Sequence, residues 1–172
     1  MKRLYLLRHA KSSWDDPTLS DSDRPLNKRG RKAAPRIGKL LRQRGWLPEL
    51  VLCSSAARAK ETWELAAAEL KPPPTEKRLK NLYLATPSQL LRALQRSPAA
   101  CGSVLLIGHN PGLATLATQL AGPGSDRKAL ARLREKYPTA GLAIFDVEGE
   151  DWTGASPGRC ALSHFVVPSD LD

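Results

Sequence analysis

RLYLLRHA, at residues 3–10, is the stretch that decides the fold. Its apolar residues suit a short buried strand, and the run stops at an arginine and a histidine, Arg8 and His9. In an open α/β sheet, ligands bind where loops leave the carboxyl ends of the strands. A strand that ends in this way brings a fixed cation and a titratable imidazole to that place. Exposed Arg-His pairs are common, however, so the pair alone does not establish a site.

Two further apolar runs end in a similar way. VLLIG at 104–108 leads directly to His109, and LVLC at 50–53 leads to Arg58 within a few residues. Parallel strands bring their carboxyl ends to one edge of a sheet, so these side chains are expected to meet. Two histidines and two arginines at one edge predict the walls of an anion pocket.

The length and composition indicate one folded domain over residues 1–172. The chain is 41% hydrophobic and 26% charged, which argues against disorder. No apolar run approaches the roughly 18–20 residues needed to span a bilayer. The first run lacks the small-residue cleavage site of a signal peptide. We therefore expect a cytoplasmic protein with no membrane partner.

The formal net charge of +10 favours acidic partners such as phosphate esters, phosphoproteins or nucleic acid. Many of the lysines and arginines, however, are scattered through residues 28–44, where an amphipathic pattern predicts a helix. Such spacing is typical of a solvated helix face. Nucleic acid is therefore not expected as a partner.

Strand and helix signals alternate along the chain. The first strand is followed by a polar loop at 11–24, and loops of this length are uncommon unless they serve a function. Asn27 is predicted to cap the next helix. Pro35 is predicted to bend or break that helix near its first turns, and Gly45 to end it.

The rest of the chain continues this alternation. Ser54 or Ser55 is a candidate cap for a second helix, and Thr86 begins a capping box with a proline at the first helical position. The expected elements are a strand at 50–53, a helix at 56–70, an edge strand at 75–79, a helix to residue 96, a strand at 104–107, a helix from residue 111, a helical stretch to residue 136, and closing strands at 141–147 and 160–166. This order predicts an α/β fold, a three-layer α/β/α sandwich with a mostly parallel central sheet.

Several common catalytic patterns are missing. The sequence contains no GxGxxG, no GxxxxGK[ST] and no GxSxG, so a dinucleotide fold, a P-loop and a Ser-His-Asp hydrolase are unsupported. No group of residues has the spacing of metal ligands. The three cysteines, Cys53, Cys101 and Cys160, indicate free and mostly buried thiols. A nucleophilic Cys53 stays open because it lies near a strand end, whereas His164 is expected in the core or at a sheet edge.

Four short motifs occur in the order and spacing of a known family. They are LRHAK at 7–11, RPL at 24–26 followed by RG at 29–30, Ser54 with Arg58-Ala59 and Thr62, and GHNPG at 108–112. Together they resemble the histidine phosphatase superfamily, and within it the small SixA-type phosphohistidine phosphatases. The superfamily also contains the cofactor-dependent phosphoglycerate mutases. The resemblance therefore implies a histidine phosphatase domain with a phosphoglycerate mutase-like fold.

The resemblance also implies a role for each residue of the anion pocket. His9 would attack phosphorus through one ring nitrogen and become a phosphohistidine, which requires a neutral ring whose other N–H is held by a carbonyl. Arg8 and Arg58 would clamp the phosphoryl oxygens. A protonated His109 would offset the charge that gathers on those oxygens. Because the arginines supply positive charge, neither a metal nor another cofactor is expected.

Four further residues are candidates for binding substrate beside Arg8 and Arg58. Lys11, Ser12 and Arg24 lie at the two ends of the polar loop and could reach the phosphate, although a solvated loop explains them equally well. Asn110 belongs to the GHNPG motif.

The sequence departs from larger family members in its proton donor. Those proteins use a carboxylate as general acid, usually a glutamate near the strand after the second helix. Here residues 77–83 read KRLKNLY, with Glu76 ahead of them and no clear acid in place. An aspartate of the polar loop could serve instead, so the candidates are Asp15, Asp16, Asp21, Asp23 or none. Mutase activity is not expected, because the chain is too short for the insertions that enclose a mutase substrate.

The preferred interpretation is a phosphatase that works through a phosphohistidine intermediate. Its expected substrate is a phosphohistidine-bearing protein, and its product is phosphate. Two alternatives remain open at this point. One is a phosphomonoesterase for small phosphorylated substrates on the same scaffold, and the other is an inactive module that binds phosphate or nucleic acid.

Overall fold

The computed structural model describes all 172 residues, and one six-stranded sheet runs through them. The strand order is β3-β2-β4-β1-β5-β6. Neighbours among β3, β2, β4 and β1 are parallel, whereas β5 is antiparallel to β1 and to β6. The strands are β1 Lys2–Arg8, β2 Leu50–Ser54, β3 Thr75–Leu79, β4 Ser103–Gly108, β5 Leu142–Val147 and β6 Cys160–Val166.

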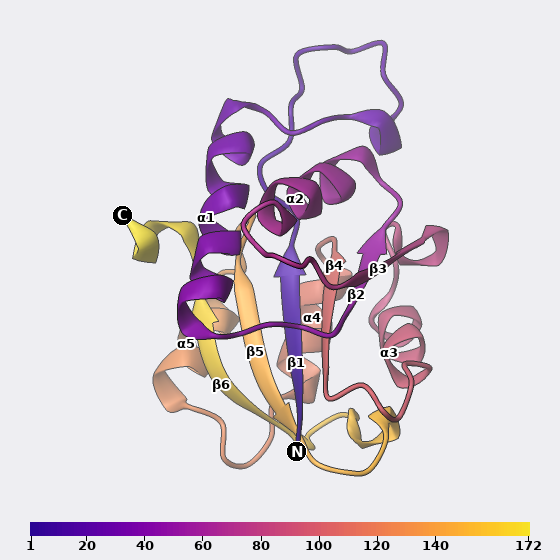
Figure 1. Cartoon of the computed structure of the whole chain (residues 1–172), viewed down its shortest axis with the longest axis vertical. Coiled ribbons are helices and arrows are strands. Elements are labelled where there is room, and N and C mark those ends of the chain that lie inside the picture. The colour runs from indigo at the N-terminus through magenta and orange to yellow at the C-terminus, as the bar shows by residue number, and fades with distance from the viewer.

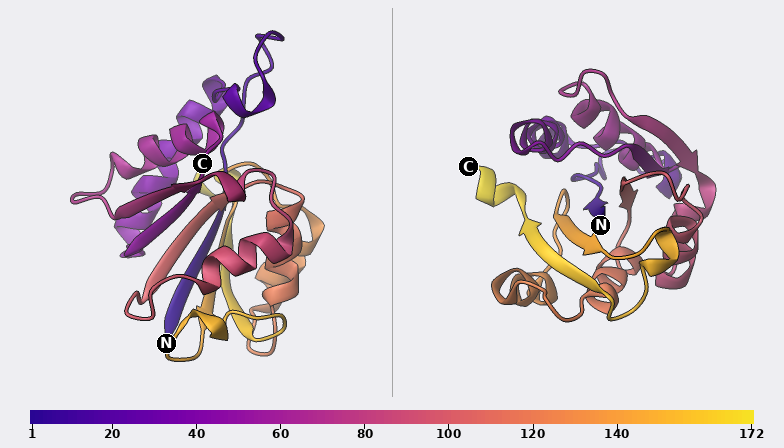
Figure 2. Two further views of the ribbon diagram at one scale, coloured as in Figure 1. Left: turned by 90° about the vertical axis from the view of Figure 1, so that its right-hand side faces the viewer. Right: turned by 60° about the horizontal axis from the view of Figure 1, so that its bottom comes forward.

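Helices cover both faces of the sheet (Figure 1). One face carries α1 (Lys28–Arg44) and α2 (Ala57–Ala67), and the other carries α3 (Pro87–Gln95), α4 (Gly112–Leu120) and α5 (Arg127–Glu135). The left view in Figure 2 shows the sheet between these two sets. The predicted three-layer sandwich with a mostly parallel sheet is therefore confirmed. None of the helices has the length and apolar character needed to cross a membrane.

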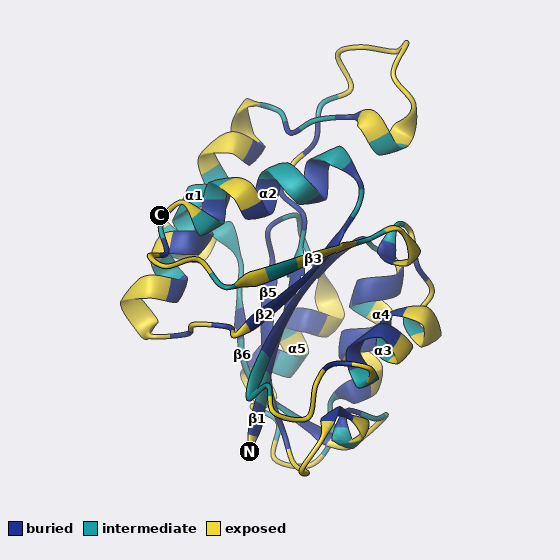
Figure 3. Ribbon diagram, turned by 45° about the vertical axis from the view of Figure 1, so that its right-hand side comes forward, coloured by how far each residue is buried: buried dark blue, intermediate teal, exposed yellow.

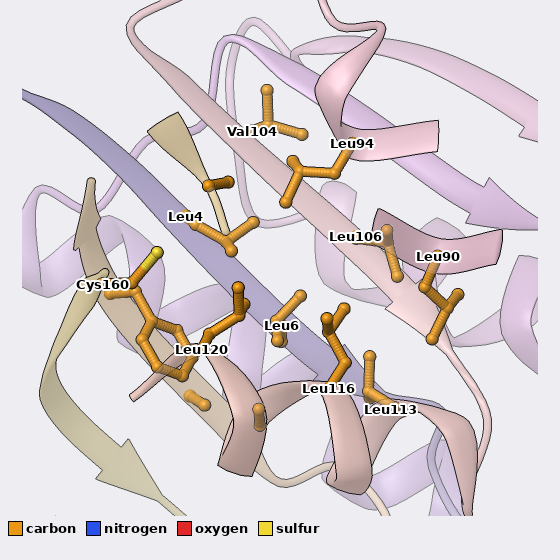
Figure 4. Close-up of a cluster of buried hydrophobic side chains, with 14 of the residues drawn as sticks. Leu4, Leu6, Leu90, Leu94, Val104, Leu106, Leu113, Leu116, Leu120 and Cys160 are labelled. Carbon is orange, nitrogen blue, oxygen red and sulfur yellow. The ribbon is translucent and has the colours of Figure 1, made fainter. Parts of the chain in front are cut away.

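Strand β1 lies inside the sheet and is buried on both faces. Its side chains alternate between the faces, as strand geometry requires. Leu4 and Leu6 join the core beneath α3 and α4, and Tyr5 and Leu7 join the core beneath α1 and α2. Figure 4 shows Leu4 and Leu6 among the leucines of the first of these cores. This burial fixes the position of the strand end.

The end of β1 stands in contrast to the loop that follows it. Figure 3 shows the central strands buried, while most of the loop at 11–24, at the top of the picture, is exposed. The loop projects beyond the helices and returns to α1 (Figure 1). The chain therefore passes from a buried strand, through the buried residues His9 and Ala10, into a long and mostly exposed segment.

Most of the predicted local signals are confirmed. The Asn27 side chain accepts a hydrogen bond from the Gly30 amide and caps α1. Gly45 ends that helix with a φ of 67°, in the left-handed region that glycine tolerates. The Thr86 capping box at α3 is also present.

Two local predictions need correction. Pro35 does not break α1, which is helical from Lys28 to Arg44. A proline costs the helix one backbone hydrogen bond, and the buried apolar face of α1 holds the remaining turns in place. The second helix ends at Ala67 rather than at residue 70, and its cap position is Ala56, which has no side-chain hydrogen bond. Neither Ser54 nor Ser55 caps it.

Candidate active site

Sheet pairing brings the two strand-end histidines together. Arg8 and Gly108 are paired across the parallel strands β1 and β4, and each is followed directly by a histidine. The ring centroids of His9 and His109 are 5.1 Å apart, and both side chains are buried. Arg58 reaches the same place from the first turn of α2, where a cation is unfavourable to the helix dipole.

His9 is held in one tautomer. Its Nδ1 lies 2.7 Å from the Ala10 carbonyl oxygen, which can only accept, so Nδ1 carries the proton and donates. The lone pair of the neutral ring therefore lies on Nε2. Burial, with smaller contributions from His109, Arg58 and Arg8, lowers the pKa of His9 to about 3. The ring is thus neutral at pH 7.

His109 is held by Ser54. The Ser54 Oγ lies 2.7 Å from Nε2 of His109 and accepts a hydrogen bond from the Ala56 amide at 3.3 Å. Nε2 of His109 is the only hydrogen-bond acceptor beside the Ser54 hydroxyl, so donation to Nε2 is the arrangement that satisfies this hydroxyl, and it places the ring proton on Nδ1. The Nδ1 atom is buried and has no partner in the protein.

The protonation state of His109 differs from the sequence-based expectation. Burial and then Arg58 lower its pKa to about 4, so the protein's own groups favour a neutral ring. Asp21 opposes this shift but does not reverse it. A neutral His109 in the tautomer that Ser54 favours still presents an N–H donor.

Arg8 and Arg58 each keep a free buried donor. Arg8 donates through Nη1 to the Tyr137 carbonyl at 3.1 Å. Arg58 donates through Nη1 to the Asp21 carbonyl at 2.7 Å and through Nη2 to the Asp21 carboxylate at 3.0 Å. The Nε atoms of both arginines are buried without a partner, as is Nδ1 of His109. Buried polar atoms without partners are rare in proteins, and these three belong to residues that the sequence predicts as the walls of an anion pocket, so they indicate an anion site.

Asp21 is the one loop aspartate that reaches this cluster. Its carboxylate accepts hydrogen bonds from the Tyr83 hydroxyl and from Arg58, and it pairs with Arg24 at 3.2 Å. The hydrogen bond from Tyr83 is the main cause that lowers the pKa of Asp21 to about 2. The Tyr83 ring also meets the ring of His109 edge-on, with centroids 5.5 Å apart.

The other loop aspartates do not approach the histidines. The Asp16 carboxylate bonds to Thr18 and the Asp23 carboxylate to Ser20, within the loop itself. Asp15 is exposed and makes no side-chain hydrogen bond or ion pair with the rest of the protein.

The candidate substrate-binding residues separate into three groups. Arg24 donates to the Ser12 hydroxyl at 2.9 Å and lies 3.5 Å from the Trp14 ring centroid, so these residues brace the loop around Asp21. Asn110 donates to the Tyr137 carbonyl at 2.9 Å, the same acceptor that Arg8 uses. Lys11 is exposed and has no ion-pair partner.

Sequence reasoning missed two contacts of this site. Ser54 was expected only as a possible helix cap or motif residue, although its position directly at the end of β2 was a usable signal. Tyr83 lies at the end of the segment searched for a carboxylic acid, and nothing in the sequence distinguishes it from a core aromatic.

The structure disfavours a nucleophilic Cys53, which the sequence left open, and agrees with the position expected for His164. Cys53 is fully buried, and burial raises the pKa of its thiol to about 12, which does not suit a nucleophile. His164 lies on the edge strand β6 against Trp46, with ring centroids 4.9 Å apart, as expected for a structural residue. No three His, Cys, Asp or Glu side chains gather in a way that could hold a metal ion.

Comparison with known proteins identifies the family. The sequence profile of the histidine phosphatase superfamily (branch 1) matches residues 4–86. An uncharacterised protein of Mycobacterium tuberculosis is 37% identical over 163 residues, which cover 94% of this chain and 99% of that protein. The crystal structure of SixA from Agrobacterium tumefaciens is 31% identical, with a TM-score of 0.80 over 97% of this chain and 98% of that one. This chain belongs to the histidine phosphatase superfamily.

A second solved structure extends the likeness in fold. The protein histidine phosphatase SixA in complex with tungstate is 24% identical, with a TM-score of 0.79 over 99% of each chain. The predicted resemblance to SixA-type proteins and the phosphoglycerate mutase-like fold are therefore confirmed. Membership of this superfamily supports a phosphatase.

Proposed function

We propose that the chain is a metal-independent phosphatase that forms a phosphohistidine at His9 and acts on phosphohistidine in a protein substrate. One observation carries the proposal. His9 is neutral with its Nδ1 proton engaged, and the three residues that lower its pKa, Arg8, Arg58 and His109, each carry a buried nitrogen without a partner. A nucleophile beside preorganised anion donors is the arrangement that phosphoryl transfer requires.

In the first step, the lone pair on Nε2 of His9 attacks phosphorus. A P–N bond forms to His9 as the P–N bond to the substrate imidazole breaks. The substrate ring is already protonated at its other nitrogen, so the departing nitrogen keeps the electron pair and the ring leaves as neutral imidazole. The Ala10 carbonyl accepts a hydrogen bond from the Nδ1–H of His9 and stabilises the positive charge that develops on this ring. Arg8 and Arg58 hold the phosphoryl oxygens in line.

His109 acts as a donor to the same oxygens. With Nε2 accepting from Ser54, the Nδ1–H of the neutral ring is free to bind a phosphoryl oxygen. A bound phosphoryl dianion would also raise the pKa of His109, because an adjacent negative charge favours the cation. The ring is therefore a donor in either protonation state.

In the second step, water attacks the phosphohistidine at His9. The P–N bond breaks, its electron pair returns to Nε2, and inorganic phosphate leaves. The same donors bind the oxygens in both transition states, so no additional group is required. Positive charge comes from the guanidinium groups of Arg8 and Arg58, which supports activity without a metal.

The carboxylate nearest the site favours phosphohistidine over alkyl phosphates. An alkoxide leaving group needs a proton donor as it departs. Asp21 is ionised at pH 7, since its pKa is lowered to about 2, and it has no proton to give. Imidazole has a pKa near ~6.5 and leaves with little assistance. The site is therefore suited to a phosphoramidate and poorly suited to a serine or sugar phosphate.

A substrate panel tests the proposal. Initial rates are compared for a phosphohistidine protein, a phosphoserine protein, sugar phosphates and an aryl phosphate, each with and without a chelator. We expect phosphohistidine to be turned over far faster than the alkyl phosphates, with no effect of the chelator. A preference for sugar phosphates would favour the small-molecule phosphomonoesterase, and absence of all turnover would favour a binding module.

A further inference from the structure

A hollow of about 330 Å³ lies between the N-terminal half of α1 and the short 3-10 turn at Pro168–Leu171. Basic side chains dominate its lining: Lys11, Arg29, Lys32 and Arg36. We refer to these four residues as the basic subsite. Three of them belong to the charged segment that the sequence predicts as a solvated helix face, and the proposed reaction does not use them.

The basic subsite lies next to the backbone that carries His9. Lys11 follows His9 by two residues, so their Cα atoms lie within about 7.6 Å of each other. α1 packs directly on this backbone, since a Cβ at Gly30 would lie 2.2 Å from the Lys11 carbonyl oxygen. Thr139 lines the hollow on its other side, and the next residue, Ala140, donates its amide to the His9 carbonyl at 3.0 Å.

Three of the four cations have no negative partner. Arg36 pairs with Asp172 at 3.0 Å, whereas no ion pair of the protein involves Lys11, Arg29 or Lys32. The spacing of three and four residues places the α1 members on one face of the helix.

The position of these cations is unfavourable in the protein alone. The first turn of α1 contains no acidic residue, and cations at a helix N-terminus oppose the helix dipole. Like charges at this spacing also repel one another. An anion that binds between them would relieve both effects.

We propose that the basic subsite binds aspartate and glutamate side chains of the phosphoprotein substrate, next to its phosphohistidine. This inference rests on the proposed function. Within the protein itself, the Asp172 carboxylate pairs with Arg36, so a carboxylate already binds a cation of this hollow. Lys11, Arg29 and Lys32 are exposed, unlike the buried donors near His9, and therefore lie where the surface of a protein substrate can reach them.

Two peptides and two charge reversals test this proposal. Each synthetic peptide carries one phosphohistidine, flanked on both sides by about three aspartates or by about three serines. Three extended residues span up to about 10 Å, which exceeds the limit of about 7.6 Å between the Cα atoms of His9 and Lys11. R29E/K32E reverses two exposed charges of the subsite. R127E/K128E makes the same change in the first turn of α5, on the opposite face of the sheet.

Both double variants are expected to fold, since acidic residues are favourable at a helix N-terminus. We expect the wild-type protein to prefer the aspartate peptide by about tenfold in kcat/KM at low salt, because each exposed ion pair contributes up to about fivefold. High salt removes this preference. R29E/K32E should lose the preference and R127E/K128E should keep it, with aryl phosphate turnover unchanged in both.

Two results would overturn the proposal. They are the absence of any preference for the aspartate peptide in the wild type and an equal loss of that preference in both double variants. Binding of a fluorescent aspartate peptide without a phosphoryl group is measured in parallel by anisotropy. If no peptide is hydrolysed, the proposed function fails, and the binding measurement then tests the basic subsite alone. Binding by the wild type that is lost only in R29E/K32E supports the subsite. Absence of binding by the wild type refutes the subsite.

Discussion

The Ser54 hydroxyl and Nε2 of His109 lie 2.7 Å apart, and both groups are buried. This contact joins the end of β2 to the residue that follows β4. Ser54 does not cap α2, because the cap position is Ala56 and the Ser54 oxygen contacts the Ala56 amide and His109. The tautomer of His109 therefore depends on a residue that has no contact with the nucleophile.

Replacing Ser54 by alanine is expected to lower kcat by roughly tenfold to a hundredfold, less than the factor of about 10²–10³ for removing a transition-state donor outright. Without the hydroxyl, the ring proton of His109 is no longer directed to Nδ1. Nitrogen NMR of the His109 ring reads the tautomer directly. Ser55→Ala is the matched control, since the Ser55 side chain makes no hydrogen bond, and equal kinetics for both variants would rule out this role.

Arg58→Ala should reduce the rate by about 10²–10³ while leaving the thermal midpoint close to that of the wild type. Arg58 is a buried cation in the first turn of α2, so its removal relieves an unfavourable interaction with the helix dipole. Arg31→Ala, which breaks a surface pair with Glu61, serves as the control and should keep full activity. Near-normal turnover in Arg58→Ala would show that this guanidinium does not hold the phosphoryl group.

The ionised state of Asp21 predicts the dependence of rate on the leaving group. For a series of aryl phosphates, the rate should fall steeply as the pKa of the phenol rises, because no carboxylic acid donates a proton. Asp21→Asn should leave this slope unchanged, whatever its effect on the absolute rate. A flat dependence in the wild type that becomes steep in Asp21→Asn would mean that Asp21 is the general acid.

The two buried histidines predict a stability that falls in mild acid. In the unfolded chain each histidine titrates near pH ~6.5, whereas in the folded protein the pKa values of His9 and His109 are lowered to about 3 and about 4. Between these limits the unfolded chain binds more protons. The free energy of unfolding therefore decreases as the pH falls from about 6.5 towards 4, by up to about 1.4 kcal/mol per pH unit for each histidine.

Urea unfolding at several pH values measures this dependence. His109→Gln removes one of the two groups and should give a shallower decline than the wild type over the same range. An identical decline in both proteins would show that His109 does not titrate differently in the folded and unfolded states.

Much of the fold follows from local sequence signals. The apolar runs that end at Arg8 and Gly108 predict strands whose carboxyl ends share one edge of the sheet, and the structure pairs these two residues. Caps such as Asn27 and Gly45 are equally local, since each depends on a backbone group a few residues away. Pro35 is the exception, because its effect on α1 depends on packing with the rest of the protein.

The contacts that support the site could not be predicted from the sequence. Four aspartates in the loop are equivalent by sequence, and only tertiary contacts with Arg58 and Tyr83 select Asp21. Ser54 beside a helix start is equally compatible with a cap and with a histidine partner. Such choices depend on where distant elements meet, which the pattern of a single chain does not specify.

Trapping the phosphorylated protein tests the central claim most directly. The protein is mixed with a phosphohistidine substrate, quenched in base within the first turnover, and its phosphorylated peptides are identified by mass spectrometry. We expect one base-stable, acid-labile phosphoryl group on His9, formed and lost as fast as the enzyme turns over and absent from His9→Ala. Turnover that persists in His9→Ala, or a phosphoryl group on another residue that keeps pace with catalysis, would contradict the account.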